Sequence, residues 1–283
     1  MDFNLIGSGR LGTQLAYALI HSGKGKLLSV FNRHFSSTEE SIRILGAGTA
    51  ISDLRKLAPA NLHFITTPDA AITHIVQQLQ EAGPVLKGSV VVHCSGVLSS
   101  EVLAPLHALG CYIVCLHPLK PFPRQLPDAE IFEGCYCSIE GDSEAIDILS
   151  PLFLNLGARL FTIQPEQKML YHAAAAIASN YLVTLADVAG KCMQQAGVGD
   201  DLAKEVIVSL MQASLSNISK ADSSAEALTG PIARGDIQTV KQHLQAISDP
   251  LVQALYRKAG LATLEFASLN EQKKQDLRSL LEI

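Results

Sequence analysis

Three glycines near the start of the chain follow a short apolar run at the spacing G-x-G-x-x-G. In a dinucleotide-binding unit the first glycine permits a tight turn, the second lets the backbone approach a pyrophosphate, and the third lets the next helix lie close to the strand. The N-terminus of that helix offers free N–H groups and a positive dipole end. The alternative is an ordinary glycine-rich turn. We predict that the cofactor contacts here are Gly7, Ser8, Gly9, Arg10, Leu11 and Gly12.

The sequence after this turn supports a β-α-β unit. Leu15, Ala16 and Leu19 continue at helical spacing, and a second apolar run spans 27–31. From there to residue 163, short β-rich runs alternate with helical patterns, which is typical of a parallel sheet with helices on both faces. The predicted strands are 3–6, 27–31, 62–66, 89–93, 112–116, 135–139 and 159–163.

The pattern changes at Pro165 to nearly continuous helical periodicity, and proline suits the first turn of a helix. We predict one long helix over 165–195 and further helices after it. The predicted fold is therefore α/β, with a Rossmann-type doubly wound sheet over 1–163 and an all-α domain over 164–283. Within the first domain, the capping-box spacing of Ser37 and Glu40 predicts a helix that begins at Ser37.

Composition limits the kinds of partner. Hydrophobic residues make up 48% of the 283 residues and charged residues 17%, which is typical of a globular protein with a large core. The net charge is -5 and basic residues are scattered, so we expect a small-molecule partner and neither nucleic acid nor a membrane. The apolar stretch 173–189 contains Ser179, Asn180 and Asp187, which favours a buried helix over a membrane span.

Two further features concern the compartment and metals. The first strand begins by residue 3, which leaves no room for a secretory signal, and we expect a cytoplasmic protein. The six cysteines lack paired C-x-x-C spacing, so we expect small buried hydrophobes in a reducing compartment. Cys135 and Cys137 would share one face of a strand, but their spacing does not favour metal binding, and we predict no metal site.

The end of the second predicted strand carries a basic residue. Asn32 and Arg33 stand there, about twenty residues after Gly12. NAD-binding units usually place an acidic residue at this point to bond the ribose 2′-hydroxyl, whereas an arginine accommodates a 2′-phosphate. We therefore predict NADP as the cofactor, with contacts from Asn32 and Arg33. The alternative is a solvated Arg33 near the edge of the sheet.

Three later strands end in residues that can reach the same edge of the sheet. Thr67-Pro68 follows one strand, His93 and Ser95 lie at the end of the next, and His117 ends a third. Ligands of doubly wound folds bind at the carboxyl edge. We predict that Thr67, Pro68 and Ser95 contact the cofactor and that His93 and His117 face the substrate. The alternatives are a plain helix start at Thr67-Pro68 and structural roles for both histidines.

These motifs carry a general resemblance. The glycine turn, Asn32-Arg33 and Thr67-Pro68-Asp69 together resemble the amino-terminal half of the superfamily of 6-phosphogluconate and 3-hydroxyacid dehydrogenases, pyrroline-carboxylate reductase and ketopantoate reductase. By domain size, this resemblance covers roughly the first 160 residues. It implies a Rossmann domain and a nicotinamide cofactor.

A closer resemblance spans the whole chain. The chain is similar to Rossmann-like NADP-binding proteins with a helical C-terminal domain of unknown function, which look like oxidoreductases without a settled substrate. The motifs that carry this resemblance are His117-Pro118-Leu119, Tyr171-His172-Ala173-Ala174-Ala175 leading to Ser179-Asn180, and Leu228-Thr229-Gly230-Pro231-Ile232-Ala233-Arg234-Gly235-Asp236.

The resemblance also implies a reactive end. In the better-known relatives a lysine on the first long helix of the second domain acts on the substrate oxygen, and an asparagine follows it four residues later. Lys168 matches the lysine, and His172 stands where asparagine is usual. We predict Lys168 and His172 as the catalytic residues, because carbonyl or imine reduction needs a positioned proton donor or positive charge. The alternative is a solvated Lys168 and a core histidine at 172.

Two residues farther along the chain complete the predicted substrate site. Asn180 begins a polar stripe on the long helix, and Arg234 lies on a short loop where it could hold a carboxylate. The alternatives are a dimer contact or a solvated face for the stripe of Asn180, and a role in tying down helix ends for Arg234.

Our leading hypothesis is an NADP-dependent oxidoreductase that transfers a hydride to or from a small carbonyl or imine substrate bound between the two domains. We expect a homodimer, because the helical half offers more apolar surface than one chain can cover. The rival hypothesis is an NADP-binding sensor or scaffold protein without hydride transfer. The histidine in place of asparagine at 172 supports the rival.

Overall fold

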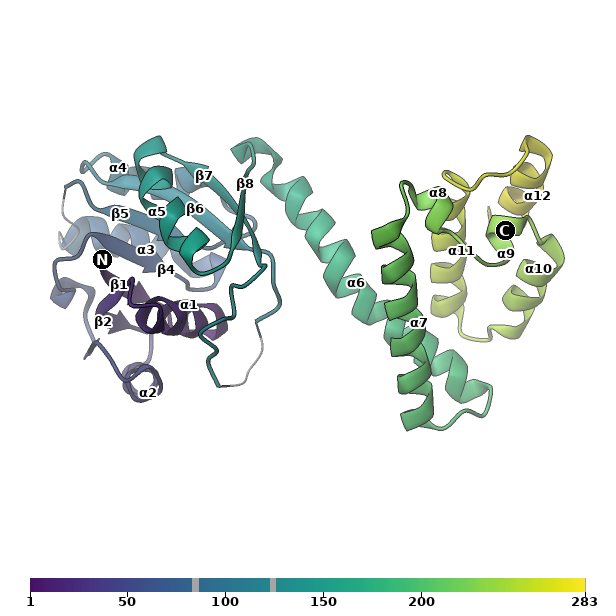
Figure 1. Cartoon of the computed structure of the whole chain (residues 1–283), viewed down its shortest axis with the longest axis horizontal. Helices are drawn as coiled ribbons and strands as arrows, with labels where there is room; N and C mark the ends of the chain where they lie inside the picture. Colours follow the sequence, from purple (N-terminus) through teal and green to yellow (C-terminus); the bar gives the residue numbers. More distant parts are fainter. Residues whose placement is uncertain (83–86, 123–125, 283) are drawn as a thin grey trace. The chain divides into compact units, whose positions relative to one another are not determined.

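The computed structural model describes residues 1–82, 87–122 and 126–282 of the chain. The chain divides into two compact units, Met1–Ala176 and Ile177–Ile283. Figure 1 labels the helices and strands of both units. Each unit is described by itself.

The first unit is built on one sheet of eight strands in the order β3-β2-β1-β4-β5-β6-β7-β8. Neighbouring strands are parallel except β6 and β7, which are antiparallel. The strands are β1 (Asp2–Ile6), β2 (Lys26–Phe31), β3 (Thr49–Ile51), β4 (Leu62–Ile65), β5 (Val90–His93), β6 (Tyr112–Pro118), β7 (Tyr136–Gly141) and β8 (Arg159–Thr162).

Both faces of the sheet are covered, so its central strands are buried on both sides. Alternate residues of a strand point to opposite faces, and Leu5 and Ile6 of β1 accordingly belong to two separate cores. Helices α1 (Arg10–His21) and α5 (Ser143–Asn155) contribute to the core of Leu5, and α3 (Asp69–Ala82) and α4 (Ala104–His107) to that of Ile6. The doubly wound sheet predicted from the sequence is confirmed.

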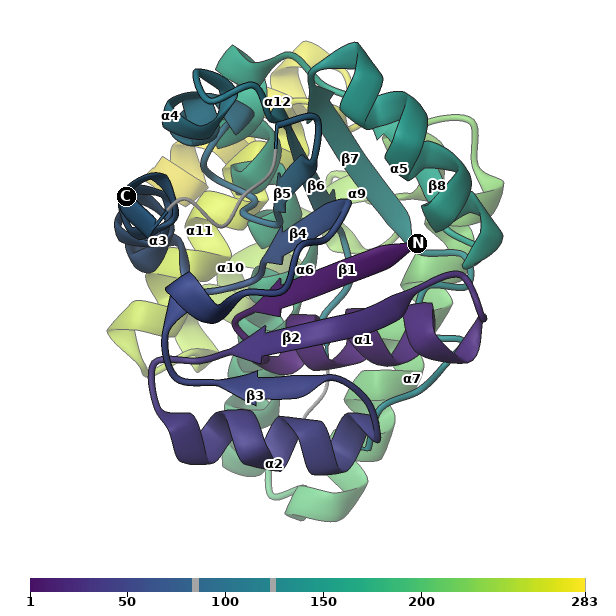
Figure 2. The ribbon, with the colours of Figure 1, turned by 90° about the vertical axis from the view of Figure 1, so that its left-hand side faces the viewer.

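The strand order reverses at the centre of the sheet. The chain runs outward from β1 through β2 to β3 and then returns to place β4 on the other side of β1, as Figure 2 shows in the succession of labels. In such sheets a crevice opens at the carboxyl ends of the strands on either side of the reversal. The glycine turn follows β1 and Thr66 follows β4, so both lie at this point.

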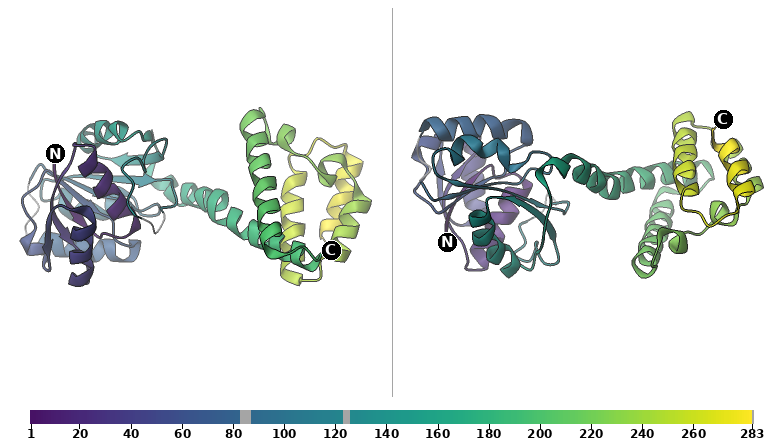
Figure 3. Two further views of the ribbon diagram at one scale, coloured as in Figure 1. Left: turned by 60° about the horizontal axis from the view of Figure 1, so that its bottom comes forward. Right: turned by 90° about the horizontal axis from the view of Figure 1, so that it is seen from above.

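The second unit is entirely helical in its described part, and Figure 3 shows its helices in green and yellow from two further sides. Its small core consists of Val240, Leu244, Leu264, Leu277 and Leu281. The helices are the later part of α6 (Lys168–Gln195), α7 (Asp200–Lys220), α8 (Ser224–Ala227), α9 (Pro231–Arg234), α10 (Ile237–Ala246), α11 (Pro250–Leu264) and α12 (Glu271–Glu282).

The long helix that begins at Pro165 differs from the sequence prediction in its burial. Within the described residues, Pro165–Gln195 is the one helix long and apolar enough to cross a membrane, with a mean hydropathy of 1.3 in its most apolar window. None of that window is buried. Ile177 and Val183 are 60% and 71% exposed. The expectation of a buried helix is therefore not met within one chain.

Three local features also bear on the sequence predictions. The compact units divide at 176/177, because the first residues of α6 pack against the sheet and Lys168 is buried there, and the domain boundary at 163/164 stays a prediction. Helix α2 (Phe35–Leu45) begins two residues before Ser37, with His34 at its N-cap, so the predicted capping box is wrong. The three-residue strand β3 was not predicted, because so short a strand has no visible periodicity.

Candidate functional site

The three glycines of the first turn meet three different steric demands. Gly7 has φ +97°, and a Cβ there would lie 2.8 Å from Cγ2 of Thr67. A Cβ on Gly12 would clash with the carbonyl oxygen of Gly7 and with Oγ1 of Thr66. A Cβ on Gly9 would meet no atom within 4 Å, and Gly9 is the N-cap of α1. The turn therefore leaves open backbone at a helix N-terminus, where an anion is favoured.

Asn32 holds this turn in place. Its Oδ1 accepts a hydrogen bond from the backbone N–H of Ser8 at 2.7 Å, and its Nδ2 donates to Oγ of Ser8 at 2.5 Å. The Ser8 hydroxyl also lies 2.5 Å from that of Ser41. Asn32 and Ser8 are predicted cofactor contacts, but in this structure both ends of the Asn32 amide are used to tie the end of β2 to the glycine turn.

The two arginines of this region are free. Arg10 and Arg33 are exposed, and neither has a hydrogen bond or an ion pair with another residue that the structure describes. The carboxyl edge of β1 and β2 therefore carries two uncompensated positive charges beside the glycine turn. Leu11 packs instead against the core of the first unit.

Thr67 and Pro68 lie across the turn, after β4. The Thr67 hydroxyl is buried and has no hydrogen-bond partner in the described part of the chain, a state that is costly without a ligand or water. Pro68 precedes α3, and its carbonyl accepts a hydrogen bond from Ala71 at 2.8 Å. The structure thus shows both the helix start and an unused polar group at this edge.

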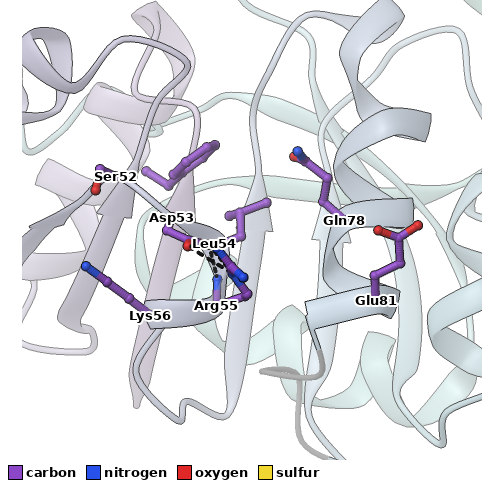
Figure 4. A pocket seen from close by; sticks show the side chains of 8 residues that line it. Ser52, Asp53, Leu54, Arg55, Lys56, Gln78 and Glu81 are labelled. Atoms are coloured by element: carbon purple, nitrogen blue, oxygen red, sulfur yellow. Dashed lines mark hydrogen bonds and ion pairs between the residues drawn. The ribbon is translucent and has the colours of Figure 1, made fainter.

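A cavity of about 640 Å³ lies near the end of β2 (Figure 4). Phe31, Leu54 and Gln78 line it together with charged residues of both signs. Arg55 pairs with Asp53 at 2.6 Å, and its hydrogen bonds lower the pKa of Asp53 to about 2. Arg55 is thus compensated by Asp53, and Lys56 and Glu81 add one charge of each sign to the lining.

His93 and Ser95 shape the loop that follows β5. His93 is fully buried, and its Nδ1 accepts a hydrogen bond from the N–H of Ser95 while its Nε2 donates to the carbonyl of Ser99 at 3.0 Å. Burial lowers the pKa of His93 to about 4. The Ser95 hydroxyl accepts from the N–H groups of Val97 and Leu98. With both ring nitrogens occupied, His93 is a support of the loop and not a free substrate contact.

Lys168 is buried in the first unit. It is 1% exposed, so the alternative of a solvated lysine is wrong. Its Nζ donates to the carbonyl of Ser95 at 3.2 Å and lies 2.9 Å from Sγ of Cys115 and 3.5 Å from Oε1 of Glu140. The Glu140 carboxylate, itself 4% exposed, also accepts from the N–H and hydroxyl of Ser100. An ammonium has three donors, and here each has a protein partner.

Beside this buried pair lies a cluster of three half-buried side chains, His117, Tyr171 and His172. His117 Nδ1 is 2.8 Å from the Tyr171 hydroxyl. Nδ1 of His172 is buried and has no partner among the residues described. Both histidine rings lie against Gly96, where a Cβ would be 2.5 Å from Nδ1 of His172 and 2.8 Å from Cε1 of His117. Only glycine at position 96 leaves enough space for both histidine rings.

Protonation in this cluster follows from burial. Burial, and then the charge of Lys168, lower the pKa of His117 to about 4, so its imidazole is neutral near pH 7. Burial raises the pKa of Tyr171 to about 12, so its phenol keeps its proton. His117 and Tyr171 are therefore neutral groups that lie next to a cation that is already paired.

Sequence reasoning missed several residues of this region. Glu140 had a signal, because it is the only acidic side chain in the otherwise uncharged β7. Tyr171 stands three residues after Lys168, a spacing that puts two residues on one face of a helix. Gly96 and Cys115 had no signal, because their roles depend on neighbours from other elements.

Asn180 and Arg234 belong to the second compact unit. Both are exposed, and the carbonyl of Arg234 accepts a hydrogen bond from Nζ of Lys273 at 3.3 Å. Their roles as substrate contacts stay predictions.

Comparison with known proteins agrees with this architecture. Residues 1–118 match a family model described as a Rossmann-like domain, and residues 135–263 match the model of DUF2520, a domain of unknown function. The two models match successive parts of the chain, first a Rossmann-like domain and then a DUF2520 domain. The resemblance inferred from the sequence is confirmed. A comparison with curated proteins finds no match.

Solved structures share the fold of this chain along nearly its whole length. A candidate NADP oxidoreductase from Bacteroides fragilis is 23% identical with a TM-score of 0.75, and the match covers 92% of this chain and 96% of that one. A protein from Thermotoga maritima is 26% identical, with a TM-score of 0.72 and coverages of 94% and 98%. An imine reductase from Streptomyces aurantiacus is 14% identical, with a TM-score of 0.69 and coverages of 99% and 99%. The fold is therefore one that oxidoreductases use.

Proposed function

We propose that this protein is an NADP-dependent oxidoreductase that transfers a hydride to or from a small carbonyl or imine compound. The observation that carries the proposal is the glycine turn, where Gly9 leaves open backbone at the N-terminus of α1 beside the free side chain of Arg33. The unpartnered Thr67 hydroxyl across the turn supports a ligand at the same edge. The fold shared with the Bacteroides fragilis protein and the imine reductase is consistent with this activity.

The proposal specifies NADP because of the charges at the end of β2. No acidic side chain stands at 32–34 to bond a ribose 2′-hydroxyl, and Arg33 is exposed and uncompensated. A guanidinium is suited to a phosphate because it can donate two parallel hydrogen bonds. When bound, the cofactor would supply or accept the hydride, and Arg33 and Arg10 would hold its phosphates.

Calorimetry tests the cofactor. We expect NADPH to bind more tightly than NADH, and Arg33→Ala to weaken NADPH at least tenfold while NADH binding stays the same. Arg43→Ala, another exposed arginine in the same region, is the matched control and should change neither affinity. NADH binding as tightly as NADPH, or an unchanged preference in Arg33→Ala, would remove the 2′-phosphate argument.

Turnover tests the activity. A panel of keto acids and cyclic imines should oxidise NADPH in the presence of the wild-type protein. One observation favours the second candidate, an NADP-binding sensor or scaffold: the Nζ donors of Lys168, the reactive lysine that the resemblance implies, are all occupied by protein groups. Tight NADPH binding with no turnover of any compound in the panel would establish that candidate instead.

We further propose that the protein acts as a homodimer in which α6 and α7 are covered by a second copy. Leu210 and Ile218 of α7 are 59% and 61% exposed, like the apolar residues of α6. The second unit also contains an apolar groove of about 580 Å³ lined by residues of α6, α10 and α11. Exposed polar residues of α6, among them Asn180 and Asp187, argue against lipid as the cover.

Analytical ultracentrifugation tests the homodimer. The wild type should sediment as a dimer, and Val183→Glu should sediment as a folded monomer because it places a charge in the apolar contact. Gln194→Glu, at a polar position of the same helix, should remain dimeric. A monomeric wild type at micromolar concentration would contradict the proposal.

A further inference from the structure

We infer that Tyr171 donates the proton in the proposed reduction and that His117 is its positioning residue, whereas Lys168 holds the loop beneath them. The inference rests on the proposed function and deepens it, because it assigns a reacting group that neither the family models nor the resemblance names.

The geometry of Lys168 argues against direct action on a substrate. Its ammonium is 1% exposed and is surrounded by the Ser95 carbonyl, the Cys115 thiol and the Glu140 carboxylate. To reach a substrate it would have to abandon a buried carboxylate, which is then left unpaired. Its contacts instead join the loop after β5 to β6, β7 and the first turn of α6.

Tyr171 bears a proton beside this arrangement and keeps some exposure. It lies three residues after Lys168 on α6 and is half-buried. Its ring meets His117 edge to face at 5.7 Å and Phe161 at 6.1 Å, which restricts its rotation. The hydroxyl lies 2.8 Å from Nδ1 of His117, near the carboxyl end of β6. That end lies at the same edge of the sheet as the glycine turn, because β1, β4, β5 and β6 are parallel.

The chemistry of the pair suits this role. As the hydride adds to the substrate carbon, the π electrons of the C=O or C=N bond move to the heteroatom, and that atom takes the proton from the Tyr171 O–H. The O–H bond breaks and leaves a phenolate, which water reprotonates. An N–H at Nδ1 of His117 would donate to the phenolate oxygen and stabilise it. An alkoxide is about as basic as hydroxide. Since the pKa of Tyr171 is about 12, proton transfer from its phenol to the alkoxide is downhill.

His172 and Gly96 lie beside the pair. The unpartnered Nδ1 of His172 and the ring edge of His117 both face Gly96. A side chain at 96 would displace the two rings and with them the Tyr171 hydroxyl. This explains the glycine at 96 without assigning either histidine a proton-transfer step of its own.

The test compares two tyrosine variants with a substrate that the wild type reduces. Tyr171→Phe should fold, bind NADPH with unchanged affinity and lose about 100-fold or more in kcat, which is the usual contribution of a general acid. Tyr136→Phe is the control, because that phenol is half-exposed in the same unit and also bonded, to Arg159 at 2.9 Å, and it should keep the wild-type kcat.

The role of His117 is tested by a conservative rescue. His117→Ala should lower kcat with KM unchanged, and His117→Asn should restore part of it, because its amide can place an N–H near the position of Nδ1. A purely structural histidine would not show this split.

The outcomes separate the two proposals. Turnover by the wild type together with wild-type kcat in Tyr171→Phe would overturn this inference and leave the proposed function standing. A Tyr171→Phe variant that folds but no longer binds NADPH would also overturn it, since the residue would then belong to the cofactor site. A wild type that reduces no carbonyl or imine would overturn both.

Discussion

The two ends of the carboxyl edge of the sheet differ in whether their polar groups already have partners within the protein. At the glycine turn the backbone is left bare, with open space at Gly9 and an uncompensated Arg33. At the end formed by β5, β6, β7 and α6, polar side chains largely have partners within the protein, as Lys168 has in the Glu140 carboxylate and His93 in the Ser99 carbonyl. The first end is built to receive charge from outside, and the second to hold a few groups rigidly. Residue type alone therefore does not identify a ligand contact.

The largest expected effect tests whether the second end depends on its buried ion pair. Lys168→Met would leave the Glu140 carboxylate buried without a cation, and we expect the free energy of unfolding of the first unit to fall by about 3–5 kcal/mol. Lys191→Met is the matched control, because Lys191 pairs with Asp187 at 2.8 Å on the same helix but both are exposed, and the loss should be much smaller. Denaturant unfolding measures both. Equal losses would mean that the buried pair has no special role.

The next effect tests the neutral histidine at this end. Burial lowers the folded-state pKa of His93 to about 4 from an ordinary value of 6.5, so between these values the unfolded chain binds more protons. Stability should therefore be complete above about pH 6.5 and should decline by roughly 3 kcal/mol as the pH falls to about 4.

The matched variants for this pH dependence are His93→Gln and His74→Gln. His93→Gln should flatten the decline in the free energy of unfolding, although His63 and His117, whose pKa values burial also lowers to about 4, retain part of it. His74→Gln, at an exposed position of α3, should leave the profile unchanged. An identical slope in His93→Gln and the wild type would show that His93 is not held neutral.

The smallest effect sharpens the description of the glycine end. Gly12→Ala should destabilise the first unit by about 1–3 kcal/mol, because its Cβ would press on the Gly7 carbonyl. Gly9→Ala should change stability by less than about 0.5 kcal/mol and weaken NADPH at least tenfold, because its Cβ would enter open space where the phosphates are proposed to lie. Thermal unfolding and calorimetry distinguish the two. Equal stability losses, or unchanged NADPH binding in Gly9→Ala, would contradict separate roles.

Local sequence predicted the parts of the molecule that depend on local physics. The glycine spacing specified a turn in which each glycine has its own steric reason, and the geometry of Gly7, Gly9 and Gly12 agrees with those reasons. The β-rich runs located all the longer strands within a few residues, and the helical periodicity located the long helix over 165–195, because burial of one face imposes its spacing on the chain. The start of the long helix at Pro165 followed from the fixed φ of proline.

Local sequence patterns were insufficient to predict element ends and strand pairing where local and long-range interactions favour different structures. The capping box at Ser37 was wrong because α2 begins at Phe35, and the Ser37 carbonyl is used as an acceptor for the hydroxyl of Ser41. The antiparallel pairing of β6 with β7 leaves no mark on the sequence of either strand, because it depends on the direction in which the intervening chain returns.

By itself, then, the sequence determined a doubly wound sheet followed by helices, a glycine turn at a helix N-terminus and an arginine at the end of β2. Only the tertiary structure decided what the polar side chains of β5, β7 and α6 do. Glu140 and Lys168 are far apart in the chain, and only the packing of α6 on the sheet brings them to 3.5 Å and closes them off from water. At that depth the candidate reactive lysine is paired, because a charge removed from water is held by its partners. The neighbouring phenol of Tyr171 is then the donor that we infer.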